Sequence, residues 1–184
     1  MYELDIGNGH HIDTATKLLV PDDTADSNNA KQVALRLSIE PTRLPGLTLG
    51  IFGTTDEVKV DIDGNIHERI FGGDLSYFHH NVEFITEYYN MSNPDDHATA
   101  YYIKLGYKIV HNITPYARYE TLNVNPADPY FINLENNTSR HQEIAGVRYD
   151  IDELRSALKF QYRIDRKVGS ETFHVWEAQW SFSF

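Results

Sequence analysis

The clearest chemistry in this sequence belongs to charged residues that occupy every second position of apolar segments. Residues with this spacing project together from one face of a β-sheet. Rows of fixed charges along a water-filled passage guide ions and small polar solutes, whereas the same charges packed closely form a salt-bridge network that fills a narrow barrel. The residues concerned are Arg36, Glu83, Glu87, Lys104, Lys108, Arg118, Glu120, Arg148, Arg155, Lys159, Arg163 and Glu177.

Catalytic chemistry has weaker support. His97 follows Asp95 and Asp96, and a histidine beside a carboxylate is a candidate general base for hydrolysis. His67 near Asp63 offers a second such pair. The sequence contains no Gly-x-Ser-x-Gly nucleophile motif, and an Asp close to a His is common by chance in polar segments. We therefore expect no enzymatic activity.

The nine histidines do not form a metal-binding pattern. His10-His11 and His79-His80 are adjacent pairs, whose side chains diverge on a strand. Segment 61–65 is similar to the start of a calcium loop, but the closing Glu is missing at the required spacing. The chain has no Cys and therefore no thiolate ligand. We expect no metal and no other cofactor.

Acidic residues predominate in the polar segments between the apolar ones. The net charge of −11 argues against nucleic acid as a partner, because phosphates require a basic surface. These acids either attract cations and divalent ions among lipopolysaccharide phosphates or simply keep the surface solvated. They are Asp13, Asp22, Asp23, Asp26, Asp56, Glu57, Asp61, Asp63, Asp95, Asp96, Asp128 and Glu135.

The length of 184 residues predicts one domain that covers residues 1–184. No run approaches the roughly 18 apolar residues of a transmembrane helix, and the mean hydropathy of −0.48 is typical of a soluble chain. A transmembrane β-barrel also has low mean hydropathy, because its lipid-facing and lumen-facing residues alternate. The aromatic content of 12% makes that class worth testing.

Period-two alternation dominates the chain and predicts an all-β fold. The connections alternate between long polar segments and short turns, which is typical of an antiparallel up-and-down meander. We expect about ten strands, at Tyr2–Asn8, Gln32–Glu40, Leu47–Thr55, Glu68–Phe78, Val82–Asn90, Ala98–Ile109, Thr114–Leu122, Gln142–Asp150, Leu154–Asp165 and Thr172–Phe184.

The bulk of the two strand faces indicates which one points outward. A soluble barrel would hold its apolar face inside. Here the apolar face carries fourteen aromatic residues, too many for the lumen of a ten-stranded barrel: Phe71, Tyr77, Phe84, Tyr88, Tyr101, Tyr107, Tyr119, Tyr149, Phe160, Tyr162, Trp176, Trp180, Phe182 and Phe184. They fall into two rows that flank an aliphatic band, as at two membrane interfaces. We therefore expect a transmembrane barrel with a polar interior.

Several segments resemble bacterial outer-membrane porins. The final segment 173–184 is similar to the terminal strand signal of such barrels, with Trp176, Trp180, Phe182 and the last residue Phe184. Upstream, segments 44–50, 73–77, 115–120 and 157–162 look like strands in the C-terminal part of phosphate-selective-like porins. The resemblance covers the chain from about Gln32 onward.

The resemblance implies a porin in the outer membrane of Gram-negative bacteria, inserted there by the barrel-assembly machinery. Porins of that family are about twice as long as this chain, with roughly 16–18 strands. The chain is then either the C-terminal part of a larger barrel or a small barrel complete in itself. Outer-membrane lipid and lipopolysaccharide would surround it, and a homotrimer is one assembly that the resemblance implies.

The sequence thus predicts passive diffusion of small hydrophilic solutes or ions. A closed, non-conducting structural barrel and an outer-membrane hydrolase are the alternatives. A soluble ligand-binding barrel is a further interpretation, and such a protein would remain monodisperse without detergent.

Overall fold

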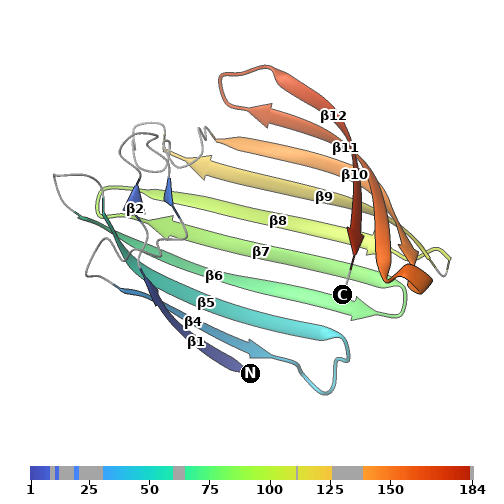
Figure 1. The fold of residues 1–184 in the computed structure, drawn as a ribbon, viewed down its shortest axis with the longest axis horizontal. Helices are drawn as coiled ribbons and strands as arrows, with labels where there is room; N and C mark the ends of the chain where they lie inside the picture. Colours follow the sequence, from blue (N-terminus) through green and yellow to red (C-terminus); the bar gives the residue numbers. More distant parts are fainter. Residues whose placement is uncertain are drawn as a thin grey trace.

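The computed structural model of the protein is one antiparallel β-sheet (Figure 1). It describes residues 1–8, 11–12, 19–20, 31–59, 65–110, 112–125 and 139–182. The strands are β1 Tyr2–Asn8, β2 His11–Ile12, β3 Leu19–Val20, β4 Lys31–Ile39, β5 Leu47–Lys59, β6 Asn65–His79, β7 Val82–Ser92, β8 His97–Tyr107, β9 Ile113–Val124, β10 Arg140–Ile151, β11 Ser156–Lys167 and β12 Thr172–Phe182. A 3₁₀ turn, η2, covers Asp152–Leu154. Over these residues no helix is long and apolar enough to cross a membrane.

The ten strands expected from the alternation all form, and they pair in chain order. The order is β1-β4-β5-β6-β7-β8-β9-β10-β11-β12, with the two-residue strands β2 and β3 off this path. Antiparallel registers join each neighbouring pair, for example Tyr88 with Tyr101 between β7 and β8. The prediction of an all-β, up-and-down, antiparallel fold is therefore confirmed.

Several expected boundaries were wrong. Strands β4 to β11 each extend beyond at least one expected end, by as much as four residues at Lys59, and two of them are clearly shorter than expected at the other end. The turn between β10 and β11 occupies residues 152–155, so β11 begins at Ser156 and not at Leu154. Arg155 has a positive φ of 43° there, which a strand does not allow. The strand expected to end at Ile109 ends at Tyr107, because Ile109 bonds across the tight turn to Ile113. The alternation does not predict β2 and β3, because these strands are only two residues long.

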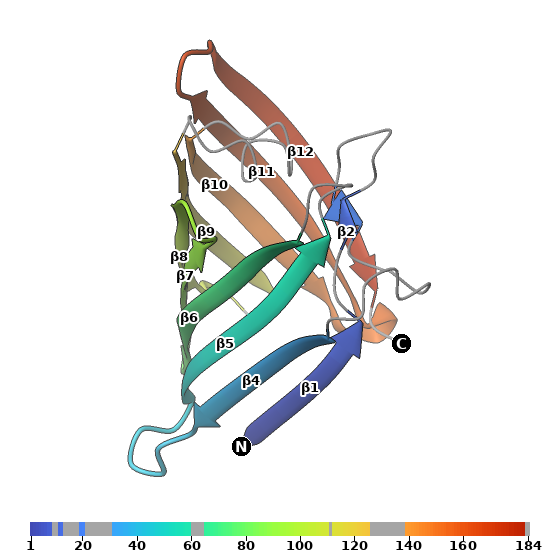
Figure 2. The same ribbon diagram turned by 90° about the vertical axis from the view of Figure 1, so that its left-hand side faces the viewer.

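The sheet is curled but open (Figure 2). β1 and β12 are its two edges, and no register joins them within the described residues. Closure into a barrel, which the sequence predicts, is thus not present in this structure. Both figures show β11 and β12 turning back over the rest of the sheet, so that the sheet forms a trough.

The apolar face of the sheet is exposed and the polar face is partly buried, which is the reverse of a soluble sheet. Along β8, Leu105 is 55% exposed, whereas the side chain of Lys104 beside it is only 18% exposed. β4 shows the same alternation, with the large apolar residues Val33, Leu35, Leu37 and Ile39 exposed and the residues between them half-buried. A soluble sheet places these two kinds of residue the other way round. We call the polar face the inner face and the apolar face the outer face.

Curvature explains why the inner face is the crowded one. On a concave surface the side chains of non-neighbouring strands converge. Inner-face residues of the described strands accordingly contact one another across an intervening strand. Arg36 of β4 reaches Asp74 of β6 across β5, and Tyr116 of β9 reaches Gln161 of β11 across β10. The ring contacts of the outer face join adjacent strands instead, as Tyr101 and Tyr119 do.

Two glycines make these crossings possible. Gly50 lies under the Arg36–Asp74 pair, and a Cβ at this position would collide with both side chains. Gly146 lies under the Tyr116–Gln161 pair, where a Cβ would come within 2.8 Å of the Tyr116 ring and of the Gln161 Cβ. Distances this short are repulsive, so a larger residue must displace the crossing side chains.

We predict that Gly146→Ala destabilises the fold by about 1–3 kcal/mol, as overpacking of a filled space does. The matched control is Gly53→Ala on β5, because a Cβ there meets only the Ile70 carbonyl oxygen at 3.7 Å. Urea unfolding followed by the fluorescence of the two tryptophans gives both free energies. Equal unfolding midpoints for the two variants would contradict the assigned crossing.

Candidate functional site

The inner face holds most of the charged residues that the sequence singled out. They come from β4 and from β7 to β12, and their alternation with apolar residues places them on one side of the sheet. The ten that lie on strands are Arg36, Glu83, Glu87, Lys104, Arg118, Glu120, Arg148, Lys159, Arg163 and Glu177. Lys108 directly follows β8 and is half-buried. Arg155 is exposed in the turn after η2, so strand alternation does not assign it to either face.

A bidentate ion pair between Glu83 and Arg148 crosses the trough. The Arg148 Nη1 and Nη2 atoms donate to the two Glu83 carboxylate oxygens at 3.0 and 2.5 Å. These residues lie on β7 and β10, so the pair spans β8 and β9. Arg148 also donates from Nε to Asp150 at 2.9 Å. The side chains of Glu83 and Arg148 are 14% and 22% exposed, and the pair therefore lies largely out of water.

Lys104 lies beside this pair within a concentration of positive charge. Its Nζ is 3.7 Å from Glu83 and 5.1 Å from the centre of the Tyr116 ring, a cation–π distance. The charges of Arg148, Lys159 and Arg118 repel the Lys104 ammonium group. Basic residues of the neighbouring strands β8 to β11 thus gather on the inner face.

Acidic residues are interleaved with these basic residues and do not form an opposite wall. Arg118 Nε contacts Glu120 at 2.8 Å. Arg163 contacts Glu177 at 2.7 Å and Asp165 at 3.6 Å. Of the two arrangements that the sequence left open, direct pairing is the geometry found, although pairing alone does not decide whether solutes pass.

A chain of hydrogen bonds continues this network toward β12. The Tyr116 hydroxyl donates to Gln161 at 2.6 Å, and the Gln161 amide donates to Glu177 at 2.5 Å. The buried amide of Gln142 donates to Asp165 at 2.9 Å. Since polar groups that are buried without partners are costly, these bonds fix the orientation of the inner side chains of β9 to β12.

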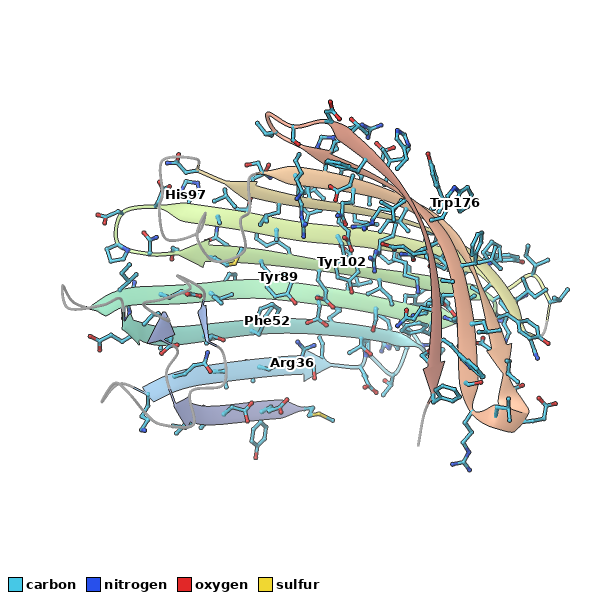
Figure 3. All side chains as sticks on the ribbon, turned by 45° about the horizontal axis from the view of Figure 1, so that its top comes forward. Arg36, Phe52, Tyr89, His97, Tyr102 and Trp176 are labelled. Atoms are coloured by element: carbon cyan, nitrogen blue, oxygen red, sulfur yellow. The ribbon has the colours of Figure 1, made fainter. Side chains whose placement is uncertain are left out.

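A second cluster combines aromatic rings with a carboxylate. Glu87 accepts hydrogen bonds from the hydroxyls of Tyr89 and Tyr102 at 2.7 and 2.9 Å. The Tyr89 ring contacts Phe52 at 5.1 Å between centres, and the Arg36 guanidinium lies 5.9 Å from the Phe52 ring centre. Figure 3 shows Arg36, Phe52, Tyr89 and Tyr102 following one another across the strands. Sequence reasoning missed the three aromatic residues, although their alternation with outer-face residues places them inside.

Some inner-face cations have no acidic partner. Within the described part of the chain, Lys159 forms no salt bridge, although it is paired in register with Arg148. Arg140 and Lys167 are also paired in register and likewise lack salt bridges to described residues. The sequence analysis did not include Arg140 or Lys167. The alternation of β10 and β11 would have placed both inside had these two strands been extended to their full length.

The outer face carries the expected aromatic rows. Tyr88, Tyr101 and Tyr119 are exposed toward the end with the long connections, and Tyr107 and Tyr149 toward the end with the short turns. Trp176, Trp180 and Phe182 of the expected assembly signal share this face and are also exposed, Trp176 by 66%. Phe184 lies outside the described residues.

Polar residues lie beyond the aromatic row at the end with the long connections. His67, His97, His141 and His174 occupy outer-face positions near the beginnings of β6, β8, β10 and β12. The His141 ring stacks on Tyr119 at 6.5 Å between centres. The Tyr162 hydroxyl and His174 Nδ1 are 2.5 Å apart. Along β8 the outer face therefore changes from apolar at Ile103 to aromatic at Tyr101 and to polar at Thr99 and His97.

The geometry of the described residues gives little support to a catalytic His–Asp pair or to a metal-binding site. His97 Nδ1 is 3.7 Å from Asp96, and its side chain is 73% exposed. The described residues contain no group of three or more His, Asp or Glu side chains that would hold a metal ion. His10, Asp61 and Asp63 lie outside the described residues.

Comparisons with protein-family models, with curated proteins and with solved structures gave no match for this chain. The resemblance to outer-membrane porins therefore stays a prediction from the sequence.

We predict that Glu83→Gln lowers the free energy of unfolding by about 1–3 kcal/mol, because Arg148 then loses its main counter-charge in a partly buried place. Glu40→Gln is the control, since Glu40 is exposed at the end of β4, and such a change costs about 0.5 kcal/mol or less. The double variant Glu83→Gln/Arg148→Met should recover part of the loss. Additive effects of Glu83→Gln and Arg148→Met would contradict direct coupling of the two side chains.

Proposed function

We propose that the chain forms the wall of an outer-membrane porin through which small hydrophilic solutes or ions diffuse passively. The observation that carries this proposal is the inverted distribution of side chains over the two faces. Apolar and aromatic residues are exposed on the convex side, and charged residues are half-buried on the concave side. Lipid solvates the first face and water the second in a transmembrane barrel.

The outer face has dimensions that suit a bilayer. Strands β5 to β12 have 11 to 15 residues, and a tilted transmembrane strand needs roughly 9–11. The apolar stretch between Tyr101 and Tyr107 on β8 is about 20 Å long, at roughly 3.4 Å per residue. Tyrosines at both ends of it occupy the positions where amphipathic rings favour a membrane interface.

The inner face supplies the charges that would govern passage. Lys104, Arg148 and Lys159 lie together on β8 to β11, and Glu83 neutralises part of this charge. Lys159 has no salt bridge within the described part of the chain. A free ammonium group on a passage wall acts on the local concentration of permeating ions.

Closure of the sheet belongs to the proposal. Unpaired backbone groups cost several kcal/mol each in hydrocarbon, so a sheet that spans a membrane must have both edges paired. We propose that β1 and β12 both take strand partners in the membrane. The wall then surrounds a lumen lined by the inner face.

A non-conducting structural barrel is the second candidate. The Glu83–Arg148 pair favours it, because this pair joins β7 to β10 over β8 and β9 and occupies space on the inner face. Ten strands closed on themselves would leave a lumen that side chains nearly fill. The two candidates differ in whether the closed form carries an ionic current.

We predict that Leu158→Arg destabilises the protein in lipid bilayers by about 2–4 kcal/mol, because Leu158 is on the outer face of β11 and would place its charge in hydrocarbon. Gln179→Arg is the matched control, since Gln179 is on the inner face of the neighbouring strand β12 and would place its charge in water. The measurement is reversible urea unfolding of both variants in lipid vesicles. Equal stability of the two variants would contradict the assignment of the faces, and a larger loss for Gln179→Arg would show that they are assigned the wrong way round.

Conductance in a planar bilayer tests the function itself. After refolding in detergent, the wild-type chain should give discrete, long-lived current steps. We predict that Lys159→Glu moves the reversal potential in a salt gradient toward cation selectivity, because a wall cation becomes an anion. Arg69→Glu on the outer face of β6 makes the same charge change away from the passage and should leave the potential unchanged. Folded protein without current steps would favour the structural barrel.

A further inference from the structure

A pocket on the inner face lies between the aromatic cluster and β10. Seven of its nine lining residues come from two cross-strand rows that the registers define, and the other two, Tyr101 and Thr121, are paired with each other between these rows. One row runs from Tyr89 through Ala100 and Leu122 to Arg140. The next row runs from Tyr102 through Glu120 to Gln142. All seven of these residues line the same cavity.

The pocket exists because the two central side chains of the first row are shorter than the two at its ends. Ala100 and Leu122 form a low apolar floor between Tyr89 on one side and Arg140 on the other. The cavity has a volume of about 210 Å³. A cavity of about 150 Å³ is enough to hold a benzene ring, so a single ring with one substituent fits.

One side of the pocket carries positive charge that no described acid neutralises. Arg140 and Lys167 are directly paired between β10 and β11, and neither forms a salt bridge within the described part of the chain. Neighbouring like charges without a counter-ion are unfavourable. An anionic ligand at this position would relieve their repulsion and accept charge-assisted hydrogen bonds from the guanidinium group.

The other polar groups of the pocket are already engaged. The Tyr89 and Tyr102 hydroxyls donate to Glu87, so these residues present their rings to the pocket and not their O–H groups. Glu120 is paired with Arg118, and the Gln142 amide donates to Asp165. A neutral polyhydroxylated ligand would therefore find few free partners. An apolar ring that bears one negative charge matches the floor, the aromatic wall and Arg140 together.

We propose that this pocket is a binding subsite for small aromatic carboxylates. The carboxylate lies against Arg140, with Lys167 adding to the potential, and the ring lies over Ala100 and Leu122 beside Tyr89 and Tyr102. As a solute preference, the inference rests on the proposed porin function, because only a passage gives solutes access to the inner face. Inorganic phosphate is a poorer match, since the apolar floor would remove its water without replacing the hydrogen bonds.

Equilibrium binding to the full chain refolded in detergent tests the subsite without a membrane current. Isothermal titration calorimetry at constant ionic strength uses benzoate as the probe. Acetate provides the charge alone, benzyl alcohol the ring alone, and phosphate a competing anion. We predict that benzoate binds at least about tenfold more tightly than any of the other three, because only benzoate uses both parts of the pocket.

Two variants test the assigned contacts. Arg140→Gln removes the anion partner, and Ala100→Leu fills the floor; each should weaken benzoate binding at least about tenfold. Arg69→Gln removes an arginine from the outer face of β6 and should leave binding unchanged. Urea unfolding midpoints establish that each variant is folded.

Unchanged benzoate affinity in both variants would overturn the proposal, as would equal affinities for benzoate and acetate or tighter binding of phosphate. Benzoate binding by a chain that gives no current steps would refute the porin function and leave the pocket in place. Current steps from a chain that does not bind benzoate would refute the binding subsite and leave the porin function in place.

Discussion

The whole arrangement depends on one constraint. Apolar and polar residues alternate with a period of two in every long strand, and the strand registers keep this alternation aligned across the sheet. Each strand presents apolar residues to one side and polar residues to the other, and the ladder hydrogen bonds keep these sides aligned from β1 to β12. A slip of one residue would exchange the faces of a strand and put Lys104 or Arg148 among the outer aromatic residues. The polar contacts across the trough and the aromatic contacts on its outside both oppose such a slip.

Curvature turns this alternation into a packed polar interior. On the inner face the space above a strand is shared by its neighbours, so a side chain of full size on every strand would not fit. Gly50 and Gly146 leave room for the side chains of flanking strands to meet above them. In the resulting pairs, such as Arg36 with Asp74, the attraction between cation and anion offsets part of the desolvation cost of placing charge on the inside. The outer face, where side chains diverge, needs no such gaps.

The sequence predicts much of this fold and less of its site. Alternation identifies the ten strands, the connection lengths predict the meander, and bulk identifies the outer face, because all three signals are local. Leu154 and Arg155 were misplaced, since an apolar residue beside a turn continues the alternation without belonging to the strand. The partner of Arg148 is 65 residues away in the chain, and only the curl of the sheet selects Glu83 among several acids. The pocket beside Arg140 depends on the registers of the strands. Alternation alone does not determine a register, because a shift of two residues keeps every side chain on the same face.

The edges of the sheet connect this fold with the proposed function. Edge strands of soluble proteins are often short or interrupted by Pro or bulges, because an open edge recruits other strands. β12 has none of these protections on its outer face, where Trp176, Trp180 and Phe182 are exposed over an 11-residue strand. β1 likewise exposes Tyr2, Leu4 and Ile6 outward and places Glu3 and Asp5 inward. Both edges therefore continue the pattern of the central strands without interruption. Further pairing at either edge extends the apolar exterior and the charged interior together, as closure in a membrane requires.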